Sequence, residues 1–231
     1  MTFPIGLQAL NRVLWAFTFC IMSINGWAST AETVPLKSVK FVDQNNQPVR
    51  DVVILGARQS LPQQSKTFVM DQVNKSFQPH VLVVPTGSSV EFPNSDDIRH
   101  HVYSFSKTKP FELKLYAGKP EAPIDFNVPG IVVLGCNIHD TMVGYIVVRD
   151  STEWAQSNNQ GIANLDRFTD TNQPIRIWHP QQENAQQFLL MELPSSESTN
   201  YRGEALIKLT LKPTESRDSK FRKSRFKRYG S

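Results

Sequence analysis

Cysteine is almost absent from this chain of 231 residues, which contains only Cys20 and Cys136. Cys20 lies in an apolar N-terminal segment that is expected to be removed, so the mature chain keeps one cysteine and forms no internal disulfide. A disulfide-stabilised scaffold is therefore excluded, and a hydrophobic core must hold the fold together. A lone thiol in an exported protein is expected to be buried, paired between chains or bound to a metal.

Long hydrophobic runs are also scarce. Hydrophobic residues make up 39% of the chain and the mean hydropathy is −0.34, values that exclude a polytopic membrane protein. No phosphate-binding loop and no nucleophile-base triad pattern is found, so neither a kinase nor a hydrolase is expected. The length leaves room for one large domain or two small ones.

The N-terminus is the exception to this polarity. Val13 to Ile24 form an apolar run after Arg12, and small residues follow at Gly26–Ala28 and Ser29–Ala31. A short run with small-x-small cleavage sites predicts a signal peptide over residues 1–31, and hence a periplasmic or secreted protein with no transmembrane segment in its mature chain. An uncleaved N-terminal anchor is the alternative.

Positive charge is concentrated at the C-terminus, although the formal net charge of the whole chain is only +4. Residues 213–231 contain seven Lys or Arg and two Asp or Glu, so with Arg12 set aside the rest of the chain carries a net charge of about −2. Nucleic acid is therefore not an expected partner of the folded part. The tail is predicted to be disordered, and the alternative role for it is contact with anionic surfaces.

Short β-branched or aromatic runs separated by turn residues dominate residues 32–150 and predict an all-β fold, a Greek-key sandwich or barrel. The segment Phe68–Phe77 is left open as a brief helical turn or an irregular loop. The eight expected strands are Val39–Val42, Val52–Leu55, His80–Val84, Ser89–Phe92, His101–Phe105, Phe111–Leu115, Ile131–Leu134 and Tyr145–Val148.

A smaller β unit is predicted over residues 151–212. Ser151–Asn172 is polar and rich in turn residues, and the alternating runs Ile175–Trp178, Phe188–Glu192 and Glu204–Leu211 follow it as strands. This C-terminal extension is either an independent module or a set of extra strands on the first sheet.

The stretch GCNIHDTM places Cys136, His139 and Met142 three positions apart, directly after an apolar strand. A thiolate, an imidazole and a thioether form a soft donor set that suits copper, particularly when a second imidazole completes it. His100 and His101 follow a polar loop and can supply that imidazole. Because neighbouring residues of a strand point to opposite faces, only one of the two is expected to reach the metal.

Two segments resemble the cupredoxins, the blue-copper β-sandwich family that includes plastocyanin and amicyanin, and in particular exported plastocyanin-like proteins labelled methylamine utilisation proteins. They are Phe92-Pro93-Asn94 through HHVYSF, and FNVPG through GCNIHDTMVGYI. The likeness covers roughly residues 34–150, about half of the chain, and the ligand loop is similar to the short amicyanin type. No residue of the chain is seen to recognise an amine.

The resemblance implies one copper ion held by His100, Cys136, His139 and Met142, with Met142 as the axial ligand. The family often has Asn after its first histidine ligand, where this chain has His101, so His101 remains the alternative ligand. The other two histidines, His80 and His179, are expected to be structural.

The expected function is electron transport: a type 1 copper protein that shuttles single electrons between redox proteins through weak, transient contacts, and not an enzyme. One mature cysteine excludes a dinuclear centre bridged by two thiolates, and five histidines are too few for a trinuclear oxidase cluster. The alternatives are a copper storage or delivery protein, a partner-recognition β-sandwich without an electron-carrier role, and a mononuclear copper enzyme in which Met142 does not bind.

Overall fold

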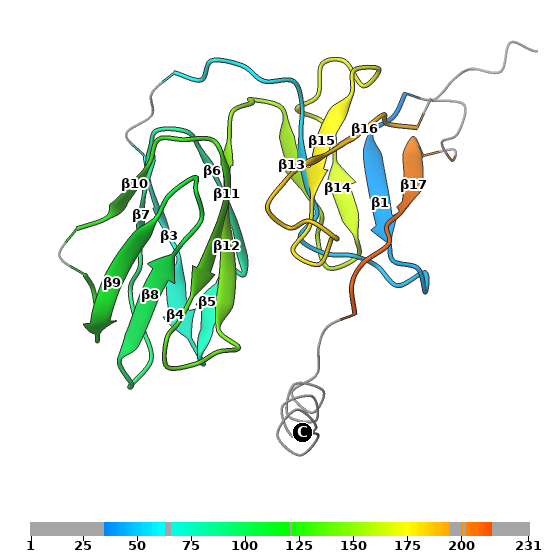
Figure 1. The fold of residues 1–231 in the computed structure, drawn as a ribbon. Coiled ribbons are helices and arrows are strands. Elements are labelled where there is room, and N and C mark those ends of the chain that lie inside the picture. Colours follow the sequence, from blue (N-terminus) through cyan, green and yellow to red (C-terminus); the bar gives the residue numbers. More distant parts are fainter. Residues whose placement is uncertain (1–34, 63–65, 121, 195–199, 201, 214–231) are drawn as a thin grey trace, which may run out of the picture. The chain divides into compact units, whose positions relative to one another are not determined.

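The structure, a computed structural model, describes residues 35–62, 66–120, 122–194, 200 and 202–213 (Figure 1). The predicted signal peptide and residues 214–231 of the predicted tail lie outside the described residues. The prediction of an all-β fold is confirmed. The strands are β1 (Ser38–Val42), β2 (Val53–Leu55), β3 (Thr67–Val69), β4 (Asp71–Val73), β5 (Ser76–Gln78), β6 (Val81–Pro85), β7 (Ser88–Glu91), β8 (His100–Ser104), β9 (Phe111–Tyr116), β10 (Ile124–Phe126), β11 (Gly130–Gly135), β12 (Val143–Arg149), β13 (Trp154–Gln156), β14 (Ile162–Asn164), β15 (Ile175–Trp178), β16 (Leu189–Met191) and β17 (Glu204–Lys208).

The middle of the chain forms one β-sandwich. A five-stranded sheet of order β6-β12-β11-β8-β9 faces a three-stranded sheet of order β10-β7-β3, and the hairpin β4-β5 adds a further pair. Side chains that alternate along these strands point inward and exclude water, as expected for two packed sheets. The core between them contains Met70, Phe77, Val84, Val90, Phe92, Val102, Phe126, Val132, Leu134, Cys136, Met142, Ile146 and Val148.

The two ends of the described chain form a second β-sandwich, with sheets of order β14-β1-β17 and β13-β2-β15-β16. The expectation that Val39–Val42 and Val52–Leu55 join the sandwich of Cys136 is therefore wrong. Strand β1 runs parallel to β17, with Ser38 opposite Glu204, and β2 pairs with β13 and β15. Alternation identified these segments as strands, but it carries no information about which distant strand each one pairs with.

A third hydrophobic core joins sheets of the two sandwiches. It contains Val53 and Leu55 of β2, Trp178 of β15, and outward-facing residues of β6, β11 and β12, namely Val81, Val83, Ile131 and Val147. Tyr145 of β12 packs against this core. The five-stranded sheet is thus covered on both faces around β12, on one face by the core that contains Cys136 and on the other by strands of the second sandwich.

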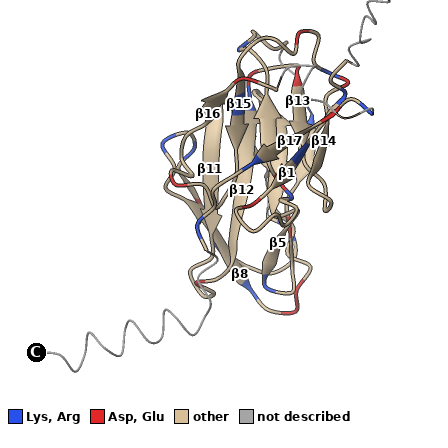
Figure 2. Ribbon diagram, turned by 90° about the vertical axis from the view of Figure 1, so that its right-hand side faces the viewer, with Lys and Arg blue, Asp and Glu red and all other residues tan. Residues whose placement is uncertain are grey.

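Three segments for which no strand was predicted contain strands. Phe68–Phe77, expected as a helical turn or irregular loop, contributes to β3, β4 and β5, Ser151–Asn172 contains β13 and β14, and Ile124–Phe126 forms β10. These strands have three residues each, too short for a clear alternating pattern. Among the described residues, no helix is long and apolar enough to cross a membrane. Basic and acidic residues are interspersed along the ribbon in the view of Figure 2.

Candidate copper site

The donor residues lie where two neighbouring strands of the five-stranded sheet end. His100 opens β8, and Cys136 follows directly after Gly135, the last residue of β11. Gly135 stands opposite Tyr103 in the β8–β11 ladder, which brings the start of β8 close to the end of β11. His139 lies in the loop between β11 and β12. His100 is fully buried and Cys136 is 3% exposed, whereas His139 is only half-buried.

The donor atoms of His100, Cys136 and His139 all lie within 4.8 Å of one another. The Cys136 Sγ atom is 3.7 Å from Nδ1 of His100 and 4.0 Å from Nδ1 of His139. With metal–nitrogen distances of about 2.0 Å and a metal–sulfur distance of about 2.3 Å, as for protein-bound zinc, a nitrogen and a sulfur of a trigonal site lie roughly 3.7 Å apart. The three side chains therefore fit a single first-row metal ion, and a set of one sulfur and two imidazoles is typical of copper.

His101 points away from this cluster. It is the next residue along β8, and its Nε2 atom pairs with Oε1 of Glu112 on β9 at 2.9 Å. Its ring also packs against Tyr103, two residues further along, at 5.5 Å between centroids. His101 thus shares the outer face of the sheet with Tyr103, as strand alternation requires, while His100 faces inward.

Met142 closes the loop that carries Cys136 and His139. Its backbone N–H donates to the carbonyl of His139 at 2.8 Å, which folds the loop back toward β12. The side chain is 1% exposed and belongs to the same hydrophobic core as Cys136. A buried thioether in this core is available as a weak axial ligand, and the coordination by Met142 remains a prediction.

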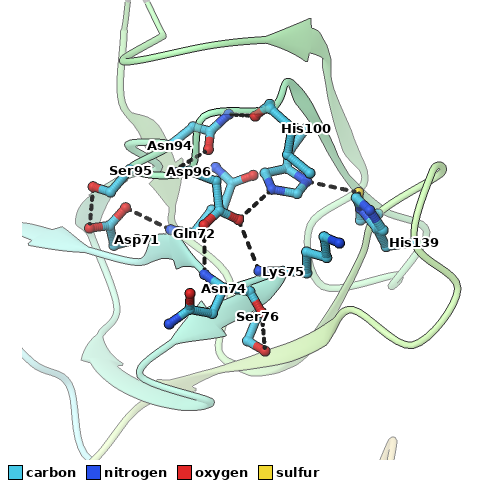
Figure 3. Close-up of polar contacts among 12 residues, drawn as sticks. Asp71, Gln72, Asn74, Lys75, Ser76, Asn94, Ser95, Asp96, His100 and His139 are labelled. Atoms are coloured by element: carbon cyan, nitrogen blue, oxygen red, sulfur yellow. Dashed lines mark hydrogen bonds and ion pairs between the residues drawn. The ribbon is translucent and has the colours of Figure 1, made fainter.

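Asp96 orients His100 from the other side of its ring (Figure 3). The His100 Nε2 atom lies 2.7 Å from Oδ2 of Asp96, so Nδ1 is the nitrogen left to face the sulfur. Asp96 also accepts the backbone N–H groups of Asn74 at 2.6 Å and Lys75 at 2.9 Å. Burial alone raises the pKa of Asp96, but the hydrogen bonds from Lys75, His100 and Asn74 outweigh it and hold this pKa below its usual value.

A buried amide network fixes the polar segment that carries Asp96. The Asn94 side-chain amide donates to the carbonyls of Ile98 at 2.8 Å and Tyr116 at 3.0 Å, which closes the segment before β8. The Gln72 amide donates to Pro93 O at 3.0 Å. The Tyr116 hydroxyl donates to Phe92 O at 2.6 Å, and burial raises the pKa of Tyr116 to about 12.

The sequence predicted only a polar loop before His100, with no role for Asp96, and Gln72, Asn74, Lys75 and Tyr116 were missed. The sequence contains a weak signal for the turn, because Asn74 is of a residue type that favours tight hairpin turns. Asn74 and Lys75 both have positive φ, 52° and 57°, as a two-residue hairpin turn between β4 and β5 requires. This backbone conformation directs both N–H groups at Asp96.

Together, the all-β fold and the inward-facing His-Cys-His cluster at the ends of neighbouring strands resemble the cupredoxin class. No family model and no curated protein matches the sequence. Solved structures of copper proteins align with part of the chain.

A Cu-containing nitrite reductase from Thermus scotoductus SA-01 aligns at 28% identity and a TM-score of 0.35, over 41% of this chain and 25% of that one. A pseudoazurin from Sinorhizobium meliltoi aligns at 24% identity and a TM-score of 0.29, over 37% of this chain and 75% of that one. An amicyanin variant aligns at 20% identity and a TM-score of 0.32, over 36% of this chain and 82% of that one. The chain thus spans about a quarter of the nitrite reductase, 25%. All three TM-scores lie below 0.5.

Proposed function

We propose that this chain is an exported type 1 copper protein that carries single electrons between redox proteins. The observation that supports it most is the convergence of one thiol sulfur and two imidazole Nδ1 atoms within 4.8 Å of one another, at the ends of two neighbouring strands of the five-stranded sheet. His100, Cys136 and His139 would hold one copper ion, with Met142 as a weak axial ligand.

The buried ligands and Asp96 would together hold the copper site in a fixed geometry. Bound copper supplies the one-electron couple. Cys136 and His100, both buried, hold their donor atoms in place on the sheet, and the Asp96 carboxylate keeps His100 in the tautomer with Nδ1 free. When the ligands are held in place, their geometry changes little between the two oxidation states of copper, and a small change in geometry favours fast electron transfer.

His139 is the proposed exit for electrons. Of the three donors in the cluster that the described residues form, His139 alone is only half-buried, whereas His100 and Cys136 are buried. Ile138 beside it is 50% exposed and offers an apolar contact. Redox partners would dock here through weak, transient contacts that release quickly. Export to the periplasm or outside the cell, through the predicted signal peptide of residues 1–31, and contact of the basic tail with anionic surfaces belong to the same proposal.

Voltammetry of the copper-loaded protein tests the carrier role. A reversible one-electron couple, with copper retained through many cycles, is the expected result. Loss of copper on reduction, or its transfer to an apo-acceptor protein, would identify storage or delivery instead. A change in the copper spectrum on adding azide or nitrite would reveal an open position and favour a mononuclear copper enzyme.

A further inference from the structure

Met142 is followed directly by a strand, and this strand limits where Met142 can lie. Strand β12 begins at Val143, the next residue, so the position of the Met142 side chain depends on how the first residues of β12 are fixed. Both faces of this strand start are occupied, one by the copper-site core and one by the second sandwich.

On the inner face, Phe77 of β5 packs directly on Gly144. A Cβ atom added at Gly144 would lie 2.7 Å from Cβ and 2.9 Å from Cγ of Phe77, so only glycine allows this approach. Phe77 is fully buried in the same core as Met142. This contact sets the depth of the strand start but leaves its outer face to other residues.

On the outer face, the ring of Tyr145 is contacted by His80 and by Trp178. The His80 ring meets it edge-on at 5.4 Å between centroids, and the backbone carbonyl of His80 accepts the Tyr145 N–H at 3.0 Å. The Trp178 ring lies 5.3 Å from that of Tyr145. Trp178 is fully buried, and its Nε1–H donates to the carbonyl of Ala185 at 2.8 Å, so this ring has little freedom to move.

His80 also reaches the residue next to Met142. Burial lowers the pKa of His80 overall, and a hydrogen bond to the backbone of Val143 offsets part of this lowering. His80 therefore contacts β12 at Val143 and at Tyr145. Trp178, by contrast, comes from β15 and belongs to the second sandwich.

We propose that His80 and Trp178 are positioning residues for Met142: by fixing Val143 and Tyr145 they hold the thioether at its distance from the copper position, and the second sandwich thereby tunes the copper site. This inference rests on the proposed function. It gives the C-terminal strands a role that the copper domain alone does not require, since the potential of such a site depends on the axial ligand.

The test compares His80→Asn and Trp178→Phe with the unmodified protein in the copper-loaded form. A Met142 thioether that withdraws stabilises copper(II) less, so both variants are expected to show an upward shift of the reduction potential and a changed electron paramagnetic resonance spectrum. Trp154→Phe is the matched control, because Trp154 packs against the same third core but makes no ring contact with Tyr145. Its potential and spectrum are expected to stay unchanged.

A second readout needs no copper. In the metal-free protein, the methyl resonance of Met142, assigned with Met142→Leu, is expected to shift in His80→Asn and Trp178→Phe and to stay in place in Trp154→Phe. An intact blue site with unchanged potential in both variants would overturn the positioning role while leaving the electron carrier standing. If the unmodified protein forms no blue site, the proposed electron-carrier function is wrong. The positioning role is then tested by the metal-free protein alone, and a Met142 resonance that does not shift in either variant would overturn it.

Discussion

His100 and Asp96 form a buried imidazole–carboxylate pair, with 2.7 Å between Nε2 and Oδ2. His100 is fully buried and the Asp96 side chain is 12% exposed, so the pair is shielded from solvent. The carboxylate is in turn held by two backbone N–H groups of the β4–β5 turn. The direction in which His100 points is thus set by residues more than 20 positions away in the sequence.

Replacing Asp96 by alanine is expected to weaken copper binding. Removal of a carboxylate that orients a ligating histidine typically lowers metal affinity by about 10- to 100-fold. Competition with a chelator of known affinity measures the change. Asp96→Asn is expected to lose less, because its amide oxygen still accepts from Nε2–H.

The matched control for this change is Glu112→Gln. Glu112 forms the corresponding pair with His101 at 2.9 Å, but on the outer face of the sheet. Its replacement is expected to leave copper affinity unchanged. Equal losses in Asp96→Ala and Glu112→Gln would show that His101 takes part in the site.

The low pKa of His179 predicts that the folded protein loses stability in mild acid. Burial lowers the pKa of His179 from 6.5 to about 4. Between these values the unfolded chain binds more protons than the folded one, so stability is fully present above about pH 6.5 and falls as the pH drops toward 4. This side chain alone is expected to remove about 2 to 3 kcal/mol between pH 7.5 and 4.5.

Urea denaturation of the metal-free protein at the two pH values measures this loss. His179→Gln is expected to show a smaller difference, because glutamine does not titrate. Burial lowers the pKa of His80 as well, so some acid sensitivity remains in the variant. An undiminished pH dependence in His179→Gln would contradict the assignment.

Lys75→Gly is expected to stabilise the fold. Lys75 has φ of 57°, a left-handed conformation that costs a residue with a Cβ atom about 1 kcal/mol, whereas glycine adopts it freely. Its contact with Asp96 is made by the backbone N–H, which the substitution keeps. Thermal unfolding is expected to show a gain of about 0.5 to 1 kcal/mol. A lower midpoint would mean that the Lys75 side chain contributes more than its backbone strain costs.

Gly135→Ala is expected to disturb the residue next to Cys136. A Cβ atom at this position would lie 2.6 Å from Cζ and 2.7 Å from the hydroxyl oxygen of Tyr103. Overpacking of this kind typically costs about 1 to 3 kcal/mol. Tyr103→Ala in the same chain removes the clash and is expected to recover part of the loss, as denaturant titration of the two variants would show. A single variant as stable as the parent would contradict the close packing.

The core of the site was predictable because its signal is local. Cys136, His139 and Met142 occupy one short loop, and strand alternation predicts that only one of His100 and His101 faces it. The resemblance to the cupredoxins then selected His100. Asp96 was not predictable as the partner of His100, because its orientation depends on the turn at Asn74 and Lys75. That turn belongs to the separate two-stranded sheet β4-β5, so its contact with Asp96 depends on how distant segments pack.

The same difference between local and distant information applies to the fold. Alternation located most strands within a few residues, since it reflects one buried and one exposed face of each strand. It did not show that β1 pairs with β17, with Val39 opposite Ala205, because pairing between such distant segments is decided by packing of the whole core. The prediction of one sandwich over residues 32–150 therefore placed β1 and β2 with the wrong strands.

The absorption and electron paramagnetic resonance spectra of the mature chain after addition of one equivalent of Cu(II), compared with those of Cys136→Ser, test the copper site most directly. An intense sulfur-to-copper band in the visible region that disappears in the variant is the predicted result. A colourless protein, or a spectrum that the substitution leaves unchanged, would contradict the site formed by His100, Cys136 and His139.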